Sequence, residues 1–272
     1  MRASEITPTV VALDGDAPVV TLDGVSKRYE EQRIGRTRRL FSVFGGIEGD
    51  VVIDDADDDD DDDDDGGFDG DESDDAVARD EGLVLDDVHL ELRGSGGIGV
   101  VGARPEGRSA LLRLIAGLAA PAHGRVVVEG RVAPLFDSLT PLVPRQGRVG
   151  RQLTLAASIL RLNGHEASRR LPEIMEFTGD PPIGRKTSLA ALTSRRRQAL
   201  LFTMLLALEP DIVLVDTRTP RSILDGRLVE RIAALKDAGA LVVATGPEPE
   251  DVAWIADSVV EVSGGRVRIL AA

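Results

Sequence analysis

The chain has 272 residues, of which 42% are hydrophobic and only 3% aromatic, so it can bury a large core built from aliphatic side chains. It contains no cysteine, which excludes disulfides and any cysteine-based metal site or nucleophile. The formal net charge is −15, but residues 50–81 hold 19 acidic residues and one arginine. Subtracting their −18 from −15 leaves +3 for the rest of the chain, so the acidity belongs to one segment.

The N-terminal residues before the first predicted strand show no clear pattern of a helix or a strand. We expect residues 1–16 to be a flexible N-terminus and residues 17–272 to form a single domain. Residues 18–29 predict a strand, a turn at Asp23-Gly24 and a second short extended piece.

An acidic segment interrupts the domain. We expect residues 42–81 to be a disordered insertion, because the nine consecutive aspartates at 57–65 repel one another and have no apolar surface to bury. A site for Ca²⁺ or for a basic partner is the alternative interpretation of this run.

After the insertion the pattern becomes regular. Residues 83–92 and 98–101 predict strands. Residues 107–119 predict a helix, because four apolar residues recur at helical spacing along one face: Leu111, Leu114, Ile115 and Leu118. Residues 125–128 and 131–136 flank Glu129-Gly130, which predicts a hairpin.

The second half alternates between helix and strand. Residues 140–208 predict a helical subdomain inserted into the sheet. Strands and helices then alternate, as expected for a parallel sheet with helical crossovers. The predicted strands are 212–215, 241–245, 258–262 and 266–270, and the predicted helices are 226–237 and 250–256.

The sharpest motif lies where the predicted strand 98–101 leads into the predicted helix 107–119. Gly102, Gly107, Arg108 and Ser109 have the spacing of a phosphate-binding loop, with arginine in place of the usual lysine. Glycines let backbone N–H groups curl around phosphates, and the start of a helix adds partial positive charge. A chance glycine-rich turn is the alternative. Farther along, the apolar strand 212–215 ends in Asp216, where phosphate-loop NTPases place a carboxylate that holds Mg²⁺.

With these motifs in place, residues 82–270 resemble ABC-transporter ATPases, and most closely the subgroup that energises export of polysaccharide and teichoic acid. The likeness lies in VVTLDGVSKRY, LVLDDVHLEL, SALLRLIAGLAAPAHGRVVVEGRVAPL, GRQLTLAASILRL and LLALEPDIVLVD. The resemblance implies an α/β phosphate-loop fold with a mixed sheet core, an inserted helical subdomain and a small antiparallel β part. It also implies ATP and Mg²⁺ as cofactors.

The resemblance also implies roles for individual residues. Tyr29 matches the aromatic residue that stacks on adenine, although a surface tyrosine at a strand end would look the same. Ser109 and Asp216 match the Mg²⁺ ligands. The nucleotide-binding set carried over from the family is Tyr29, Gly102, Gly107, Arg108, Ser109 and Ala110. The signature turn corresponds to Thr193, Ser194 and Arg195, where arginine replaces a glycine.

Several positions depart from the family pattern in ways that weaken catalysis. Arg108 keeps the charge of lysine but not its compact shape. Pro105 lacks an N–H, and Glu106 places a carboxylate beside the expected phosphates. Thr217 stands in the position of the catalytic glutamate and cannot act as a general base near neutral pH. Gly246 stands in the position of the switch histidine.

Other polar residues give weaker signals. No glutamine stands clearly in the sensing loop, although Asp137 lies nearby. The arginines at 195–197 could clamp phosphates of a nucleotide bound by a partner, but exposed arginines on a helix are usually a solvated face. The histidines are scattered and predict no metal site: His89, His123 and His165.

Together these observations predict an ATP-binding subunit whose own hydrolysis is weak or lost. As partners we expect a membrane permease and a second ATP-binding subunit, in a homodimer or a heterodimer, and no nucleic acid. No apolar run approaches the ~18 residues of a membrane span, so we expect a cytoplasmic protein held peripherally at the inner face of the membrane by the permease. The alternatives are a non-catalytic scaffold that retains the fold and, least favoured, an active ATPase with unusual residues.

Overall fold

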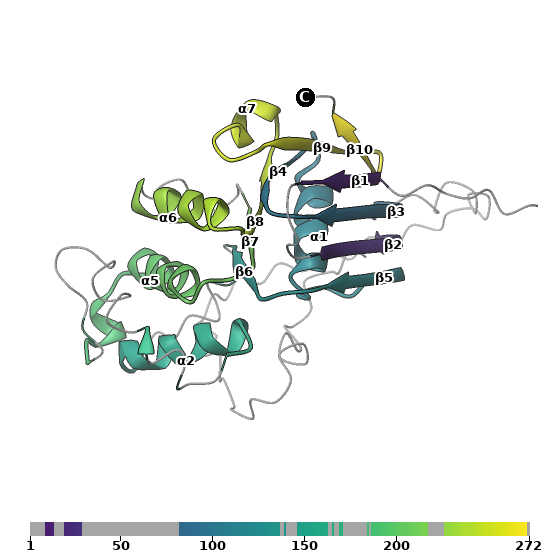
Figure 1. The fold of residues 1–272 in the computed structure, drawn as a ribbon. Coiled ribbons are helices and arrows are strands. Elements are labelled where there is room, and N and C mark those ends of the chain that lie inside the picture. The colour runs from purple at the N-terminus through teal and green to yellow at the C-terminus, as the bar shows by residue number, and fades with distance from the viewer. Residues whose placement is uncertain are drawn as a thin grey trace, which may run out of the picture.

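A computed structural model of the chain describes residues 9–13, 19–28, 82–136, 139, 146–162, 165, 169–170, 184, 186–216 and 226–270. The acidic insertion predicted at 42–81 lies outside these ranges, so its predicted disorder stays a prediction. Within them the chain forms two β-sheets and a group of helices (Figure 1).

The larger sheet has six strands in the order β10-β9-β4-β8-β7-β6. All neighbours are parallel except β9 and β10, which form an antiparallel edge. The strands are β4 (Gly96–Val101), β6 (Val132–Leu135), β7 (Ile212–Val215), β8 (Leu241–Gly246), β9 (Ser258–Ser263) and β10 (Arg266–Leu270). Every residue of β7 and β8 is buried, which explains why their sequences are continuous apolar runs.

The smaller sheet has four strands in the order β1-β3-β2-β5. It consists of β1 (Thr9–Ala12), β2 (Val19–Arg28), β3 (Leu83–Arg93) and β5 (His123–Val128). The β2–β3 and β2–β5 pairs are antiparallel, whereas β1 runs parallel to β3. This sheet is the small β part that the resemblance implies.

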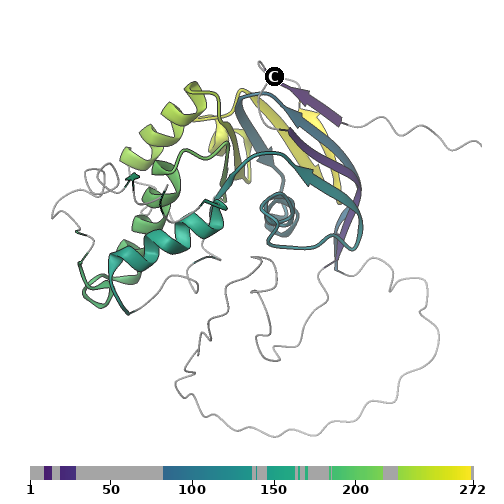
Figure 2. The same cartoon turned by 60° about the horizontal axis from the view of Figure 1, so that its bottom comes forward.

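The helices cover both faces of the larger sheet. They are α1 (Pro105–Ile115), α2 (Val149–Ile159), α5 (Ser194–Ala207), α6 (Gly226–Asp237) and α7 (Pro249–Val252), with a 3-10 turn η2 (Leu189–Ala191) before α5. Helix α1 contacts β8 and β9 of the larger sheet and β3 and β5 of the smaller one. Figure 2 shows α1 end-on between the two sheets. The core therefore packs around α1, whose Leu111 and Leu112 are fully buried.

Helices α2 and α5 form the inserted helical layer, and α5 also contacts α6 and β6. With 14 residues, α5 is the longest helix of the described ranges. None of the helices in those ranges is both long enough and apolar enough to span a lipid bilayer.

Three sequence predictions need correction. Residues 9–12, expected within a flexible terminus, form β1, because this apolar stretch pairs with Leu90–Arg93 at the edge of the smaller sheet. The hairpin predicted around Glu129-Gly130 is wrong, since β5 pairs with β2 and β6 pairs with β7 in the other sheet. The helix predicted to reach residue 119 ends at Ile115, shortly before Gly117 with its positive φ of 68°.

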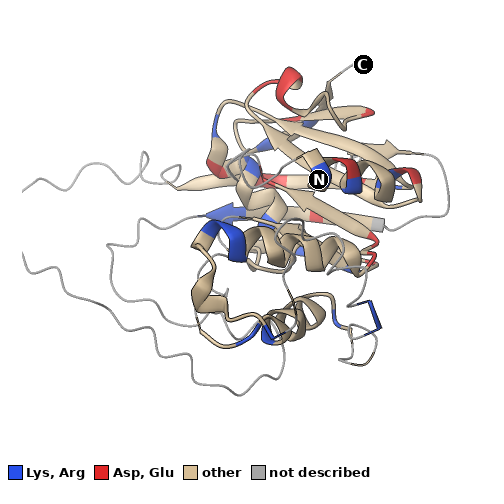
Figure 3. Cartoon of the chain, turned by 90° about the vertical axis from the view of Figure 1, so that its left-hand side faces the viewer, with Lys and Arg blue, Asp and Glu red and all other residues tan. Residues whose placement is uncertain are grey.

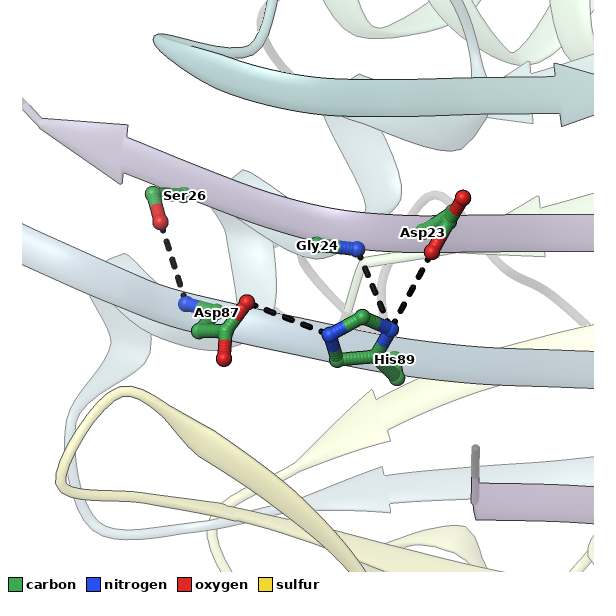
Figure 4. A network of polar contacts seen from close by, with 5 residues as sticks. All are labelled: Asp23, Gly24, Ser26, Asp87 and His89. Carbon is green, nitrogen blue, oxygen red and sulfur yellow. Dashed lines mark hydrogen bonds and ion pairs between the residues drawn. The ribbon is translucent and has the colours of Figure 1, made fainter. Parts of the chain in front are cut away.

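A small polar network joins β2 to β3 where their pairing is irregular (Figure 4). The Gly24 N–H lies 3.3 Å from Nδ1 of His89, which is also 3.2 Å from Asp23 Oδ1, and Nε2 of the same ring lies 3.1 Å from Asp87 Oδ1. Asp87 has a φ of 47°, and its N–H donates to the Ser26 hydroxyl. These contacts tie the two strands together. No group of histidine and acidic residues able to hold a metal occurs in the described ranges.

Candidate functional site

The predicted phosphate loop joins a strand to a helix, as its spacing requires. It leaves β4 at Val101 and enters α1 at Pro105, so only residues 102–104 lie outside regular structure. Pro105 is the first helical residue, and the N-cap Arg104 makes no side-chain cap bond. The Gly102 N–H donates to the Pro247 carbonyl at 3.3 Å. Much of the motif is therefore wound into the helix, and the loop itself is short.

Both motif glycines are required by packing against one residue of β9. Gly102 has a φ of 144°, and a Cβ there would lie 2.2 Å from the Val262 carbonyl oxygen. A Cβ at Gly107 would lie 3.0 Å from Cγ1 of Val262. The close approach of α1 to β9 thus explains the two glycines without any ligand.

The predicted metal ligands lie together at the ends of α1 and β7. The Ser109 hydroxyl donates to Oδ2 of Asp216 at 2.8 Å, and both side chains are buried. Oδ1 of Asp216 accepts from the hydroxyl of Thr245 at 3.1 Å. Thr245 is the last residue but one of β8, which pairs with β7, and our sequence analysis did not identify it as a site residue. The signal was the parallel pairing of the two strands, which places their carboxyl ends at one edge of the sheet.

Arg108, in the lysine position of the motif, turns back into its own loop. Only 5% of the residue is exposed, and Nη1 donates to the Gly102 carbonyl. Its Nε has no hydrogen-bond partner among the described residues. Burial lowers the pKa of this guanidinium, and the carboxylates of Asp216, Glu106 and Asp251 partly oppose that effect. The guanidinium is thus buried against the first carbonyl of the loop, and three carboxylates attract it electrostatically.

The residues fit the two expected cofactors unequally. Mg²⁺ prefers oxygen ligands, and the Ser109–Asp216 pair supplies a hydroxyl and a carboxylate in contact. A phosphate needs inward-facing N–H donors, but Pro105 has none and Arg108 lies within the loop. The metal side of the site therefore matches Mg²⁺, whereas the phosphate side does not match a nucleotide.

The switch position has no space for the histidine of the family. Gly246 is buried at the end of β8, and a Cβ there would lie 2.7 Å from Cβ of Asp251 and 3.0 Å from Cγ1 of Val252. Both contacts come from α7, which packs on β8. The absence of histidine is thus built into the packing of α7.

The signature turn is closed by its own side chains. Thr193 caps α5 by accepting from the Arg196 N–H at 3.3 Å. Arg197 folds back, with Nη1 donating to the Leu192 carbonyl at 2.6 Å and Nη2 to the Ser194 hydroxyl at 2.9 Å. The start of α5 is basic (blue in Figure 3), and Arg195 is exposed there. The signature serine is thus engaged within its own chain.

The other predicted site residues divide into two groups. Ala110 is fully buried in α1 and offers only its backbone to a ligand. Tyr29, Thr217 and Asp137 lie outside the described residues, so their roles stay predictions.

Comparison with known proteins finds distant similarity to ATP-binding proteins of transporters. No protein-family model matches the chain. It is 28% identical over 206 residues to a methionine import ATP-binding protein of Corynebacterium efficiens, covering 69% of this chain and 56% of that protein. It is 27% identical to an energy-coupling factor transporter ATP-binding protein of Symbiobacterium thermophilum (68% and 70% covered). It is 26% identical to an O-antigen export ATP-binding protein of Klebsiella pneumoniae (68% and 76% covered).

Solved structures give the same answer for the fold. An ATP-binding subunit of an ABC transporter superposes with a TM-score of 0.60 at 18% identity, covering 93% of this chain and 90% of that one. An inward-facing metal-chelate type ABC transporter gives a TM-score of 0.56 at 15% identity, covering 93% and 83%. The predicted fold class is confirmed: the chain has the α/β phosphate-loop fold of ABC ATPases, and its sequence is similar to those of ABC-transporter ATP-binding subunits.

Proposed function

We propose that this chain is the nucleotide-binding subunit of an ABC transporter and that its own ATP hydrolysis is weak or lost. The observation that carries the proposal is the buried contact between Ser109 and Asp216, which joins the phosphate loop to the strand that ends in a carboxylate. These two side chains would hold Mg²⁺, which when bound neutralises phosphate charge. Without such a pair the fold alone would say little about function.

Weak hydrolysis is supported by the residue types at two positions of the sequence. Thr217 follows Asp216 directly and cannot accept a proton from water near neutral pH. Gly246 carries no side chain at the switch position, and the packing of α7 leaves none room. Loss of a general base alone typically lowers a rate by ~10²–10⁴.

Partners and substrate follow from the same relationship. We propose that the chain sits at the cytoplasmic face of a cell membrane, bound to a permease, in a homodimer or with a second ATP-binding subunit. For the cargo we propose a cell-surface polysaccharide or teichoic acid moving outward, which the resemblance in the sequence and the O-antigen export relative support. The methionine import relative supports the opposite direction.

A second candidate function is a scaffold that keeps the fold without using nucleotide. The burial of Arg108 favours it, because this side chain, in the position of the phosphate-binding lysine, is bonded to the Gly102 carbonyl of its own chain. A scaffold would still dock on a permease or on another ATP-binding subunit.

Two measurements on the purified full-length protein separate these functions. Thermal unfolding with millimolar Mg·ATP distinguishes a nucleotide binder from a scaffold, since a ligand at 100 times its Kd adds ~2.7 kcal/mol to the free energy of unfolding. Phosphate release, with Asp216→Ala as the blank, measures hydrolysis. Turnover at ordinary enzyme rates that disappears in Asp216→Ala would contradict weak hydrolysis, and an absent thermal shift would favour the scaffold.

A further inference from the structure

The phosphate loop already contains a charged group of the chain itself. Arg108 lies in the first turn of α1 with 5% of its surface exposed, and its Nη1 donates to the carbonyl of Gly102, the first residue of the motif. A guanidinium is normally exposed, so its burial here requires compensation from the surrounding groups. The neighbouring carboxylates provide that compensation in part.

The chemistry of these contacts is opposite to that of a phosphate cradle. A phosphate would need N–H donors around it, whereas the guanidinium takes the Gly102 carbonyl as its acceptor and is attracted by the charges of three carboxylates. Its Nε still lacks a partner among the described residues, so the arrangement satisfies the cation incompletely. Because the guanidinium is incompletely hydrogen-bonded here, it loses little when it leaves this position, so an entering nucleotide can displace it.

We propose that Arg108 is a built-in occupant of the phosphate loop, which a nucleotide must displace before its phosphates can enter. This inference rests on the proposed function, because it states how the same site is regulated. It reverses the expected effect of substitution: removing the arginine raises the affinity for nucleotide. A residue that binds phosphate directly, as a lysine would, gives a loss of affinity instead.

The first test asks whether Arg108 occupies the loop when no ligand is present. The full-length protein is treated briefly with phenylglyoxal, which modifies accessible guanidinium groups, and the modified peptides are quantified by mass spectrometry. Arg104 is exposed in the same loop and serves as the internal reference. We expect Arg104 to be modified and Arg108 to be protected at least about tenfold. Equal labelling of the two arginines overturns the proposal, whatever the protein does with nucleotide.

The second test measures the affinity for Mg·ATP by calorimetry in the parent protein, Arg108→Met and Arg108→Gln. Neither new side chain can bind phosphate as a lysine would, so tighter binding reports removal of the occupant, and Arg108→Gln keeps the test valid if the methionine variant does not fold. The matched control is Arg113→Gln, in the last turn of the same helix. We expect both Arg108 variants to bind about tenfold more tightly than the parent and the control to match the parent.

The outcomes separate this inference from the proposed function. If the parent binds nucleotide and the Arg108 variants bind equally or more weakly, the subunit function stands and the occupant proposal is overturned. If neither variant nor parent binds at millimolar concentration, displacement of Arg108 is not what limits binding. That result overturns the proposal and removes nucleotide binding from the proposed function as well.

Discussion

Restoring the family histidine at position 246 should damage the fold and should not rescue catalysis. A Cβ at Gly246 would lie 2.7 Å from Cβ of Asp251, 3.0 Å from Val252 and 3.2 Å from the Glu248 carbonyl, all of them on or beside α7. Overpacking of this kind costs about 1–3 kcal/mol. Burying an imidazole without partners adds about 1–3 kcal/mol, so we expect Gly246→His to lose about 2–6 kcal/mol of unfolding free energy.

Thermal and urea unfolding measure this loss, which corresponds to a fall of about 4–24 °C in Tm at about 2–4 °C per kcal/mol for a domain of this size. Gly246→Ala isolates the Cβ contact and should lose about 1–3 kcal/mol. Gly226→Ala is the control, since nothing lies within 4 Å of the added Cβ and the residue opens α6, so its stability should stay equal or rise slightly. A Gly246→His protein with unchanged Tm and increased ATP turnover would refute the packing argument.

Two further predictions concern buried polar contacts. Thr245→Val removes the hydroxyl that donates to Asp216, so urea unfolding should show a loss of about 1–3 kcal/mol, most of which Thr245→Ser restores; an unchanged valine variant would contradict this. Burial raises the pKa of Asp257, but the Gly97 N–H (2.7 Å) and Lys236 lower it more, so the net pKa lies below its ordinary value. Asp257 therefore stabilises the fold above about pH 4, and this contribution is lost as pH falls through the depressed folded-state pKa. Asp257→Asn should be less stable than the parent at pH 7 and approach it near pH 3, whereas a pH-independent difference would contradict the linkage.

Much of the fold could be predicted because its core elements have strong local patterns. The run Ile212–Val215 is apolar throughout and β7 is buried throughout, as a central parallel strand must be. The apolar spacing from Leu111 to Ile115 gave the buried face of α1. These elements were predictable because the spacing of apolar residues within each one is enough to identify it as a strand or a helix.

The failed predictions concern partners that local pattern does not specify. Glu129-Gly130 has the composition of a tight turn, and a turn does lie there, but β5 and β6 leave it for different sheets. A hairpin and a crossing between sheets have the same local sequence, so only the long-range pairing with β2 and β7 decides. The edge strand β1 was missed because four residues beside a polar terminus give too short a pattern.

The site divides in the same way. Contact between Ser109 and Asp216 could be predicted, because motif spacing and strand order place both at one end of the sheet. The direction of a long side chain could not. Arg108 has many rotamers, and its turn towards Gly102 depends on the burial of α1 and on carboxylates that include Asp216 and Asp251, which are distant in the sequence.

The two motif glycines show why a surviving motif is weak support for a surviving function. Gly102 and Gly107 both face Val262, and a methyl group at either position would collide with β9 or press against it. Packing alone therefore keeps glycine at position 102 and favours a small residue at position 107, even if no phosphate ever enters. The residues of this motif that differ from the family are Pro105, Glu106 and Arg108. Whether this loop handles nucleotide thus depends on the guanidinium of Arg108, since the glycine spacing would persist in either case.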